Sequence, residues 1–436
     1  MLRALSRPAT RLMERWLPDA FIFVLVLTII AALCAGIFVG NSPIAVIRMW
    51  GDGFWKLLEF SMQMLLVLVT GYILASSPPV KATLARMAGL ATTAGGAIIL
   101  VSVVSLAASW LNWGFGLVVG AIFARELARQ IRVDYRLLVA SAYSGFVIWH
   151  GGISGSIPLT ISTAGHFTED QIGIVPTSDT IFAYWNLIIC AALFIAVPIA
   201  NRMMLPDDDE MVIVDPEKLR APPDEPMPAN PTPAQRLENS RILMWAVGIP
   251  GLLWLVMHFA GGGGLNLNVV NMIFLFVGIV LHGTARSLLA ALDQAVKGGA
   301  GIVIQFPFYA GIMAIMTGSG LATSLSEFFV SISSADTLPF WSFIAGGIVN
   351  IFVPSGGGQW AVQAPVMLPA AETLGASMPR VAMAVAWGDA WTNLLQPFWA
   401  LPMLGIAGLK ARDIMGYCVV MLLVTGIIIG AGLLFL

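Results

Sequence analysis

Charged side chains are scarce in this sequence. Only 11% of the 436 residues are charged and 58% are hydrophobic, whereas soluble domains average about 25% charged residues. Apolar runs long enough to span a bilayer, which takes about 20 residues, recur along the whole length. The composition therefore excludes an ordinary soluble domain and predicts an all-α membrane protein that crosses the bilayer many times.

Cysteines and metal-binding motifs are also few. Cys34, Cys190 and Cys418 are the three cysteines; they lie within apolar runs and have no metal-binding spacing, so we interpret them as packing residues. The net charge of −2 and the lack of a basic stretch mixed with aromatic residues give no indication of a nucleic-acid partner. No His-Glu-x-x-His motif of a metalloprotease occurs, and no cofactor is expected.

The apolar runs suggest a topology. Arginines precede the first run, which is long, lacks a small-residue cleavage site and is followed by many others, so we interpret it as a retained helix with a cytoplasmic N-terminus. About nine transmembrane helices are expected, near 19–40, 59–77, 137–157, 180–202, 242–260, 267–283, 299–318, 380–399 and 413–435. Two further apolar segments, 95–130 and 338–375, are expected to be re-entrant hairpins.

The basic residues test this topology, because cytoplasmic loops carry most of the lysines and arginines of a membrane protein. Of the 22 such residues, all but Arg48, Lys56 and Arg380 fall on the expected cytoplasmic side. The loops 158–179 and 319–337 contain none, as external loops should. If either hairpin crossed the membrane fully, every later loop would change sides and this asymmetry would be lost.

A polar stretch divides the chain into two halves. Residues 203–240 contain four consecutive acidic residues and a proline-rich run. They cannot bury enough apolar surface to fold alone, so we expect a flexible cytoplasmic linker. The first half, 1–202, would form one repeat, and 241–436 would form an extra span followed by a second repeat.

The two halves share polar residues in the same order. Five pairs match at offsets of 238 to 242 residues: Asp52 with Asp293, Lys56 with Lys297, Gln63 with Gln305, Asn112 with Asn350, and Pro158 with Pro397. Four spans and the extra span separate the copies, and this odd number of crossings would invert the second copy. Inverted repeats whose helices break at corresponding positions near the midplane are typical of secondary transporters.

Glycine-rich sequences mark the two expected hairpin tips, NWGFG and SGGGQ. Glycine costs about 1 kcal/mol relative to alanine inside a helix, but at a tip it allows a sharp turn and the close approach of a ligand. The helix after each tip begins with free N–H groups and can bind an anion without a lysine or arginine. The expected substrate-binding residues lie at both tips and in the interrupted spans that follow them: Asn112, Gly114, Gly116, Ser154, Ser156, Ser355, Gly356, Gly357, Gly358, Gln359, Thr392 and Asn393.

One carboxylate is expected at membrane depth. Asp389 is the only acidic residue that this topology places well inside a span, and such a residue is functional by default. Hydroxyls, unwound carbonyls and one carboxylate suit Na⁺, whereas a protonatable Asp389 suits H⁺, and the sequence leaves this choice open. The expected coupling residues are Asp389, Asn112, Asn350 and Gln396, with Na⁺ held at Asn350, Asp389 and Asn393.

The same residues have plainer explanations. The glycines could serve only close helix packing, Asp389 could be the structural partner of a helix end, and His150 fits a site or a packing role equally. The run Gly152–Gly155 matches the G-x-S-G pattern of rhomboid-type intramembrane serine proteases, although such an enzyme would leave the second hairpin and the repeat unexplained.

Seven longer motifs are spread along the chain: MWGDGFWKLLEFSMQM, LNWGFGLVVGAIFARELAR, GGISGSIPL, IQFPFYAGI, VPSGGGQW, LLQPFWALP and LKARDIMGYC. They resemble the short-chain fatty acid transporters of the AtoE type, within the broad ion-transporter superfamily with paired re-entrant hairpins. The resemblance implies no enzymatic activity, a homodimer in the lipid of a bacterial inner membrane, and an elevator motion. It also implies uptake of monocarboxylates such as acetoacetate or butyrate.

The chemistry of such a substrate agrees with the residues. A monocarboxylate entering a cell with a negative interior moves against about 2.3 kcal/mol per 100 mV, so we expect symport with a cation. A dicarboxylate or an acylated amino acid is an alternative substrate, although a dicarboxylate would need a second cationic anchor and no lysine or arginine is expected at depth. An anion channel is a more distant alternative.

Overall fold

The protein is built from helices. A computed structural model describes residues 20–219, 230–351, 353–395 and 399–436, and these contain no β-strand. The described segments that are long and apolar enough to cross a membrane are seven: Leu58–Ser76, Ala94–Leu111, Tyr135–Ile161, Tyr184–Met203, Pro233–Ala260, Ala285–Ser319 and Ala411–Phe435. The expected all-α membrane architecture is confirmed, while the expected cytoplasmic N-terminus lies outside the described residues.

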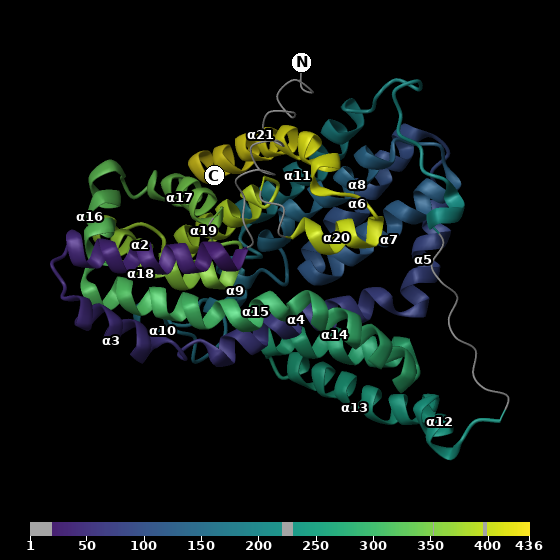
Figure 1. Cartoon of the computed structure of the whole chain (residues 1–436), viewed down its shortest axis with the longest axis horizontal. Helices are drawn as coiled ribbons and strands as arrows, with labels where there is room; N and C mark the ends of the chain where they lie inside the picture. Colours follow the sequence, from purple (N-terminus) through teal and green to yellow (C-terminus); the bar gives the residue numbers. More distant parts are fainter. Residues whose placement is uncertain (1–19, 220–229, 352, 396–398) are drawn as a thin grey trace.

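One group of helices forms a frame. This frame bundle consists of α2 (Ala20–Ile37), α3 (Pro43–Gly53), α4 (Leu58–Ser76), α13 (Arg241–Ala260), α14 (Leu267–His282) and α15 (Ala285–Ser319). Helix α15 packs against α2, α3 and α4, and α14 packs between α4 and α13. Most of these helices run along the lower side of Figure 1. Glycines allow the close packing, since Gly53 lies against Ala314 and Gly299 against Leu65.

A second group carries both hairpins and both interrupted spans. This hairpin bundle consists of α6 (Ala94–Leu111), α7 (Trp113–Gln130), α8 (Tyr135–Ser144), the 3-10 helix η1 (Gly145–Gly151), α9 (Ser156–Ile161), α11 (Tyr184–Met203), α17 (Leu338–Asn350), α18 (Gly356–Leu374), α19 (Met378–Thr392), α20 (Ala400–Ala407) and α21 (Ala411–Phe435). Most of it lies above the frame bundle in Figure 1. The two bundles meet where α7 packs on α4 and where α18 packs on α15.

Short helices complete the fold: α5 (Pro78–Ala88), α10 (Glu169–Ile172), η2 (Thr177–Asp179), η3 (Pro216–Leu219), α12 (Pro233–Glu238) and α16 (Leu321–Ile332). Helix α5 packs on α7 and α16 packs on α18. Each half therefore has a long helix, then a short helix, then a hairpin whose second arm the short helix covers. The inversion of the second half stays a prediction.

Both expected hairpins are antiparallel helix pairs. Helices α6 and α7 are joined at Asn112 alone, and a Cβ added to Gly120 would meet Ser105 on the opposite arm. In the second hairpin, the Ser342 hydroxyl on α17 contacts the Met367 sulfur on α18 at 3.5 Å. Each segment thus turns back on itself, as a hairpin that enters and leaves a membrane on one side must do.

The two spans that follow the hairpins are interrupted, as expected. Asp134 caps α8 by accepting the Leu137 N–H at 2.8 Å, and the helix tightens into η1 after Ser144 before α9 begins at Ser156. In the second half α19 ends at Thr392 and α20 begins at residue 400. Residues 396–398, between these two helices, lie outside the described residues.

One expected span is too short. The structure replaces 299–318 by the 35-residue helix α15, which begins after the cap Thr284 and includes Arg286, Asp293 and Lys297. Hydropathy ends a predicted span at its charged residues, but a helix continues past them because its backbone hydrogen bonds are internal. The expected spans 19–40, 59–77, 180–202, 242–260, 267–283 and 413–435 coincide with helices to within a few residues at the ends that are described. The span 137–157 is divided among α8, η1 and α9, and within 380–399 helix α19 already ends at Thr392.

The first part of the expected linker contacts the hairpin bundle. The Val212 N–H donates to Oδ2 of Asp134 at 2.8 Å, and the Tyr135 N–H donates to the Val212 carbonyl at 2.9 Å. Arg132 donates to the carbonyl of Asp208 at 3.4 Å. Residues 220–229 lie outside the described residues, so the flexibility of the whole linker stays a prediction.

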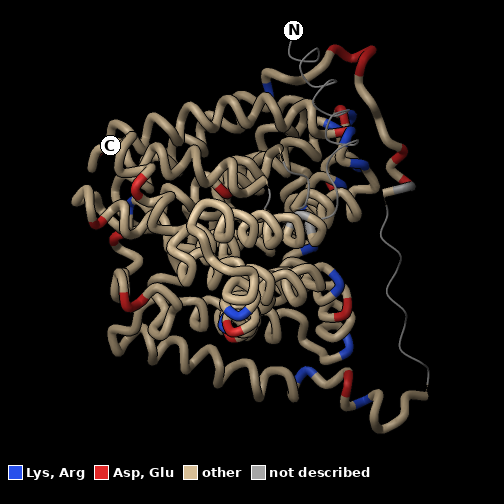
Figure 2. The backbone as a smooth tube through the Cα atoms, turned by 60° about the vertical axis from the view of Figure 1, so that its left-hand side comes forward, with Lys and Arg blue, Asp and Glu red and all other residues tan. Residues whose placement is uncertain are grey.

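The charged residues are distributed unevenly. Figure 2 shows most of the lysines and arginines towards the right-hand side, whereas the left-hand side carries mainly acidic residues. This distribution agrees with a cytoplasmic end rich in basic residues, although the sidedness itself stays a prediction.

Candidate functional site

The tip of the second hairpin is a buried helix N-terminus. The Ser355 hydroxyl accepts the Gly358 N–H at 3.4 Å, and the Ser355 carbonyl accepts the Gln359 N–H at 2.7 Å. The N–H groups of Gly356 and Gly357 have no partner within the helix, because a first turn leaves its donors unpaired. These two amides and the positive end of the helix dipole suit a carboxylate.

Two glycines of this tip lie against aromatic rings of the frame bundle. A Cβ added to Gly357 would lie 2.4 Å from Cζ of Phe60 on α4, and one added to Gly358 would lie 2.4 Å from Cδ2 of Tyr309 on α15. Side chains do not approach this closely, so any larger residue would push the hairpin and the frame apart. The glycine run is therefore needed where the two bundles touch.

The rings above the tip belong to a larger aromatic cluster. It consists of Phe60, Phe167, Phe306 and Tyr309, whose neighbouring ring centroids are 5.5 to 5.7 Å apart. Its members come from α4, α15 and the loop after α9. The cluster forms an apolar wall beside the first turn of α18.

A histidine organises the loop that carries Phe167. One ring nitrogen of His166, Nε2, donates to the Gly173 carbonyl at 3.0 Å, and Nδ1 accepts from the Thr168 hydroxyl at 2.9 Å. Burial lowers the pKa of His166, although the Gly173 carbonyl and the nearby Glu169 act in the opposite direction. The neutral imidazole thus holds the loop in place.

The first hairpin tip is closed by contacts within the protein. The Asn112 Oδ1 accepts the Phe115 N–H at 2.8 Å, and the Trp113 N–H donates to the Ser154 hydroxyl at 2.8 Å. Ser154, expected to bind substrate, therefore caps the tip in this structure. Of the N–H groups in the first turn of α7, only that of Gly114 has no acceptor among the described residues.

The glycines of the first tip face backbone rather than rings. A Cβ on Gly114 would lie 3.0 Å from the Cα of Leu68, and one on Gly116 would lie 2.5 Å from the Cα of Ser109. Close helix packing is sufficient reason for both glycines. Their role in substrate binding stays a prediction, and the second tip has the more open arrangement of donors.

Asp389 is fully buried, with 0% of its surface exposed. Neither carboxylate oxygen accepts a hydrogen bond from the described residues. His150 is the nearest titratable partner, with Nδ1 4.0 Å from Oδ1 of Asp389. Since an unpaired buried carboxylate is very costly, this residue requires a proton or a cation.

His150 connects Asp389 to the second tip. Its Nδ1–H donates to the Ala386 carbonyl at 2.6 Å, which leaves Nε2 as the acceptor, without a partner among the described residues. A Cβ added to Gly356 would lie 2.3 Å from this Nε2. One imidazole therefore contacts both the expected anion site and the expected coupling residue.

Further unpaired oxygens lie on the helices around Asp389. Asn350 donates to the Asp389 carbonyl at 3.0 Å, and Gln359 donates to the Gly346 carbonyl at 2.9 Å and to Gln363 at 2.8 Å. The amide oxygens of Asn350 and Gln359 accept no hydrogen bond from the described residues. Among the described residues, no group of three or more His, Cys, Asp or Glu side chains is placed so that it could hold a metal ion. A carboxylate and neutral oxygens are ligand types that suit a hard cation, and a cation site formed by these atoms stays a prediction.

The remaining expected residues hold the interrupted span together. The Thr392 hydroxyl donates to the Gly347 carbonyl at 2.9 Å and accepts from Asn350 at 2.9 Å. Oδ1 of Asn393 accepts from the Trp149 indole at 3.1 Å, while its amide group interacts with the Asp389 carboxylate without forming a hydrogen bond of good geometry. Ser156 starts α9 and is buried, and Gln396 lies outside the described residues.

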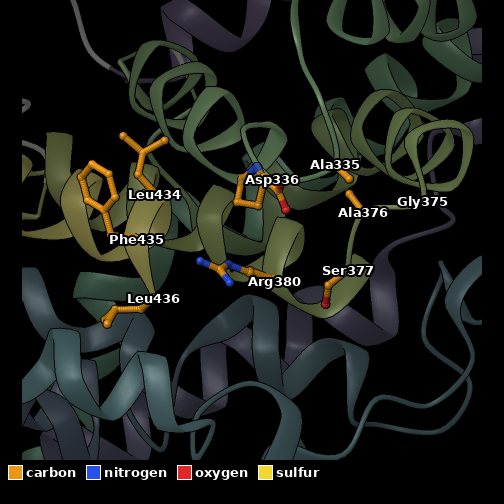
Figure 3. A pocket seen from close by; sticks show the side chains of 10 residues that line it. Ala335, Asp336, Gly375, Ala376, Ser377, Arg380, Leu434, Phe435 and Leu436 are labelled. Carbon is orange, nitrogen blue, oxygen red and sulfur yellow. The ribbon is translucent and has the colours of Figure 1, made fainter.

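A surface pocket lies apart from this site. Figure 3 shows Asp336 and Arg380 among its lining residues, which come from the loop before α17, the first turn of α19 and the end of α21. Arg380 donates to the Leu433 carbonyl at 2.9 Å, and its guanidinium lies 5.7 Å from the Trp185 ring centroid. None of the expected substrate residues lines this pocket.

Three contacts at the site were not foreseen from the sequence. Phe60 lies in the sequence LLEFSMQM and Tyr309 follows two phenylalanines in IQFPFYAGI, but nothing in these local sequences distinguishes either ring from a packing residue. The sequence does not distinguish a site role from a packing role for His150. Its contact with Gly356 forms only when the two halves of the chain fold together. To predict that these rings lie beside the tip, one would have to know how the helices pack against one another.

Comparisons with known proteins identify the family. The family model described as short chain fatty acid transporter matches residues 1–436. A protein of Escherichia coli K12, named as a member of this transporter class, is 45% identical over 437 residues that cover 99% of both chains. A protein of Haemophilus influenzae with the same name is 42% identical over 447 residues that cover all of both chains.

A solved structure supports the fold. The YdaH transporter of Alcanivorax borkumensis matches with a TM-score of 0.57 and 17% identity, covering 94% of this chain and 97% of that one. The family and its relatives are transporters and not enzymes, so the protease alternative has no support. The chain belongs to the short chain fatty acid transporter family.

Proposed function

We propose that this protein imports short-chain monocarboxylates, such as acetoacetate or butyrate, across a bacterial inner membrane by symport with a cation. The observation that carries the proposal is the second hairpin tip, where the N–H groups of Gly356 and Gly357, which have no acceptor among the described residues, lie beside an apolar aromatic wall. The amides suit a carboxylate group and the wall suits a short acyl tail.

The distribution of positive charge favours one carboxylate over two. Among the described residues no lysine or arginine side chain is buried. A dicarboxylate would bring a second charge into the site with no cation to balance it, and burying an unpaired charge is very costly. A monocarboxylate needs only the helix N-terminus and the coupling cation.

Asp389 is the proposed coupling residue. Its unpaired carboxylate and the free amide oxygens of Asn350 and Gln359 support a cation that enters with the substrate. Protonation of Asp389 would serve the same purpose, so H⁺ and Na⁺ are both consistent with the donor set. One cation makes the transported complex neutral, which removes the opposition of the membrane potential.

The two bundles suggest how access alternates. Both hairpins and both interrupted spans belong to the hairpin bundle, and the rings that face Gly357 and Gly358 belong to the frame bundle. We propose that the hairpin bundle moves as a unit against the frame, in an elevator motion, with the halves related as inverted repeats. A homodimer and a cytoplasmic N-terminus are part of the same proposal.

Uptake by purified protein in liposomes tests this function. Labelled butyrate should accumulate, beyond the passive uptake of butyric acid by protein-free liposomes, when an inward gradient of one cation, Na⁺ or H⁺, is imposed, and unlabelled acetoacetate should compete. Succinate should compete poorly, because it carries a second carboxylate. Strong competition by succinate with none by acetoacetate would favour the dicarboxylate alternative instead.

A further inference from the structure

Phe60 occupies a particular place at the boundary between the two bundles. Its ring covers Gly357, with Cζ 2.4 Å from the position that a Cβ would take, and only 8% of the residue is exposed. Gly357 supplies one of the two N–H groups of the tip that have no acceptor among the described residues. The ring therefore lies directly beside the proposed binding position of the carboxylate.

The space around this ring is closed by other apolar groups. Phe60 packs edge-on against Phe167 at 5.5 Å and against Phe306 at 5.7 Å between centroids. The Met64 sulfur, one helical turn further along α4, would lie 3.4 Å from a Cβ on Gly357. A tail leaving the amides on this side meets Phe60 first and its neighbours next.

We infer that Phe60 sets the longest acyl chain that the transporter accepts. This inference rests on the proposed function, since it takes the carboxylate to lie at the amides of Gly356 and Gly357. A short tail can pack against the ring, whereas a longer tail needs the volume that the ring fills. Protein interiors are close-packed, so neighbours cannot make that volume available without strain.

The effect of removing the ring follows from the same geometry. Phe60→Ala leaves a space lined by Phe167, Phe306 and Met64, and a longer tail can fill it. Each CH₂ group that leaves water for an apolar site improves binding by about fourfold. Two further CH₂ groups, as in hexanoate compared with butyrate, should therefore gain about 15-fold in the variant.

Phe308 offers a matched control on the neighbouring helix. It lies on α15 two residues from Phe306, but its ring packs against Trp50 and Phe54 of the frame at 6.2 and 5.2 Å. Phe308→Ala thus also removes a packed phenylalanine ring while leaving the tip and the aromatic cluster intact. It corrects for any general effect of losing an aromatic side chain.

Competition against labelled butyrate in proteoliposomes is the test, with straight-chain acids from acetate to octanoate. Phe60→Ala should raise the preference for hexanoate over butyrate by about 15-fold, and Phe308→Ala should leave it unchanged. Phe60→Leu, which keeps more of the volume, should give a smaller shift and replaces Phe60→Ala if the latter does not yield folded protein.

Two outcomes overturn the inference: an unchanged preference in both Phe60 variants, or an equal change for all acids. These results are separate from failure of the proposed function, which would show as an absence of butyrate uptake by the unmodified protein. If the unmodified protein takes up butyrate, these results test only the assignment of Phe60.

Discussion

His150 and Asp389 meet across the two halves of the chain, with Nδ1 of the imidazole 4.0 Å from Oδ1 of the carboxylate. Both residues are fully buried. His150 belongs to the first interrupted span and Asp389 to the second, so the contact forms only when both halves are folded together. The same imidazole touches Gly356 at the second tip, which connects the proposed coupling residue to the proposed anion site.

Asp389→Asn should uncouple transport. The substitution keeps the shape of the side chain but removes its charge, and a neutral amide neither carries a proton nor balances a cation. Cation-driven accumulation of butyrate should fall to an internal-to-external ratio of about one or below, because the monoanion alone is opposed by a negative interior. The measurement is accumulation in proteoliposomes, with butyrate exchange as the test that folded protein is present.

An unchanged dependence on the cation gradient in well-folded Asp389→Asn would contradict this role. The structural alternative differs in a measurable way, since it expects poor yield of folded protein and intact coupling in whatever remains.

Gly357→Ala should impair transport severely. The added Cβ would lie 2.4 Å from Phe60 Cζ, and relief of such a contact costs about 1–3 kcal/mol, which corresponds to a loss of about 5- to 150-fold. Gly405→Ala is the matched control, since no atom lies within 4 Å of a Cβ at that glycine of α20. Equal uptake by the two variants would show that the tip does not need its glycines.

The sidedness of the first hairpin can be tested by labelling. Ala164 and Gln130 are exposed and lie in the loop after α9 and at the end of α7. In a background without the three native cysteines, Ala164→Cys should react with an impermeant thiol reagent from outside and Gln130→Cys only from inside. Reaction of both from one side would remove the re-entrant topology and the inverted repeat with it.

Acid should loosen the loop that carries Phe167. Since burial lowers the pKa of His166, its contribution to loop stability is complete above the ordinary imidazole value of about 6.5 and is lost as the pH falls below it. Protection of the amides of residues 162–173 against hydrogen exchange, relative to the intrinsic exchange rate at each pH, should therefore fall between pH 7 and pH 5. His166→Gln should remove most of that pH dependence, and an equal dependence in the variant would exclude His166 as its source.

Much of the fold could be predicted from local patterns. Apolar runs of membrane length marked the helices, and glycines within them marked both tips. Asp389 stood out because a carboxylate inside an apolar run is rare. The span 299–318 was too short because Asp293 and Lys297 ended the apolar run, although the helix continues through them to Ala285.

The arrangement of side chains at the site could not be predicted in this way. Ser154 was expected at the substrate, but it caps Trp113 on another helix, a contact between residues 41 positions apart. Phe60 and Tyr309 face the glycine tip only because the two bundles pack together. Such contacts depend on tertiary geometry, which periodicity and composition do not encode.

The central claim is that this protein is a carrier of short-chain monocarboxylates, and counterflow tests it most directly. Proteoliposomes loaded with unlabelled butyrate and placed in a trace of labelled butyrate should accumulate the label transiently above its external concentration, with no ion gradient imposed. Loading with acetoacetate should give the same overshoot, and loading with chloride should not. Label that only equilibrates, with no overshoot for any of these carboxylates, would contradict the account and indicate a channel or a transporter of something else.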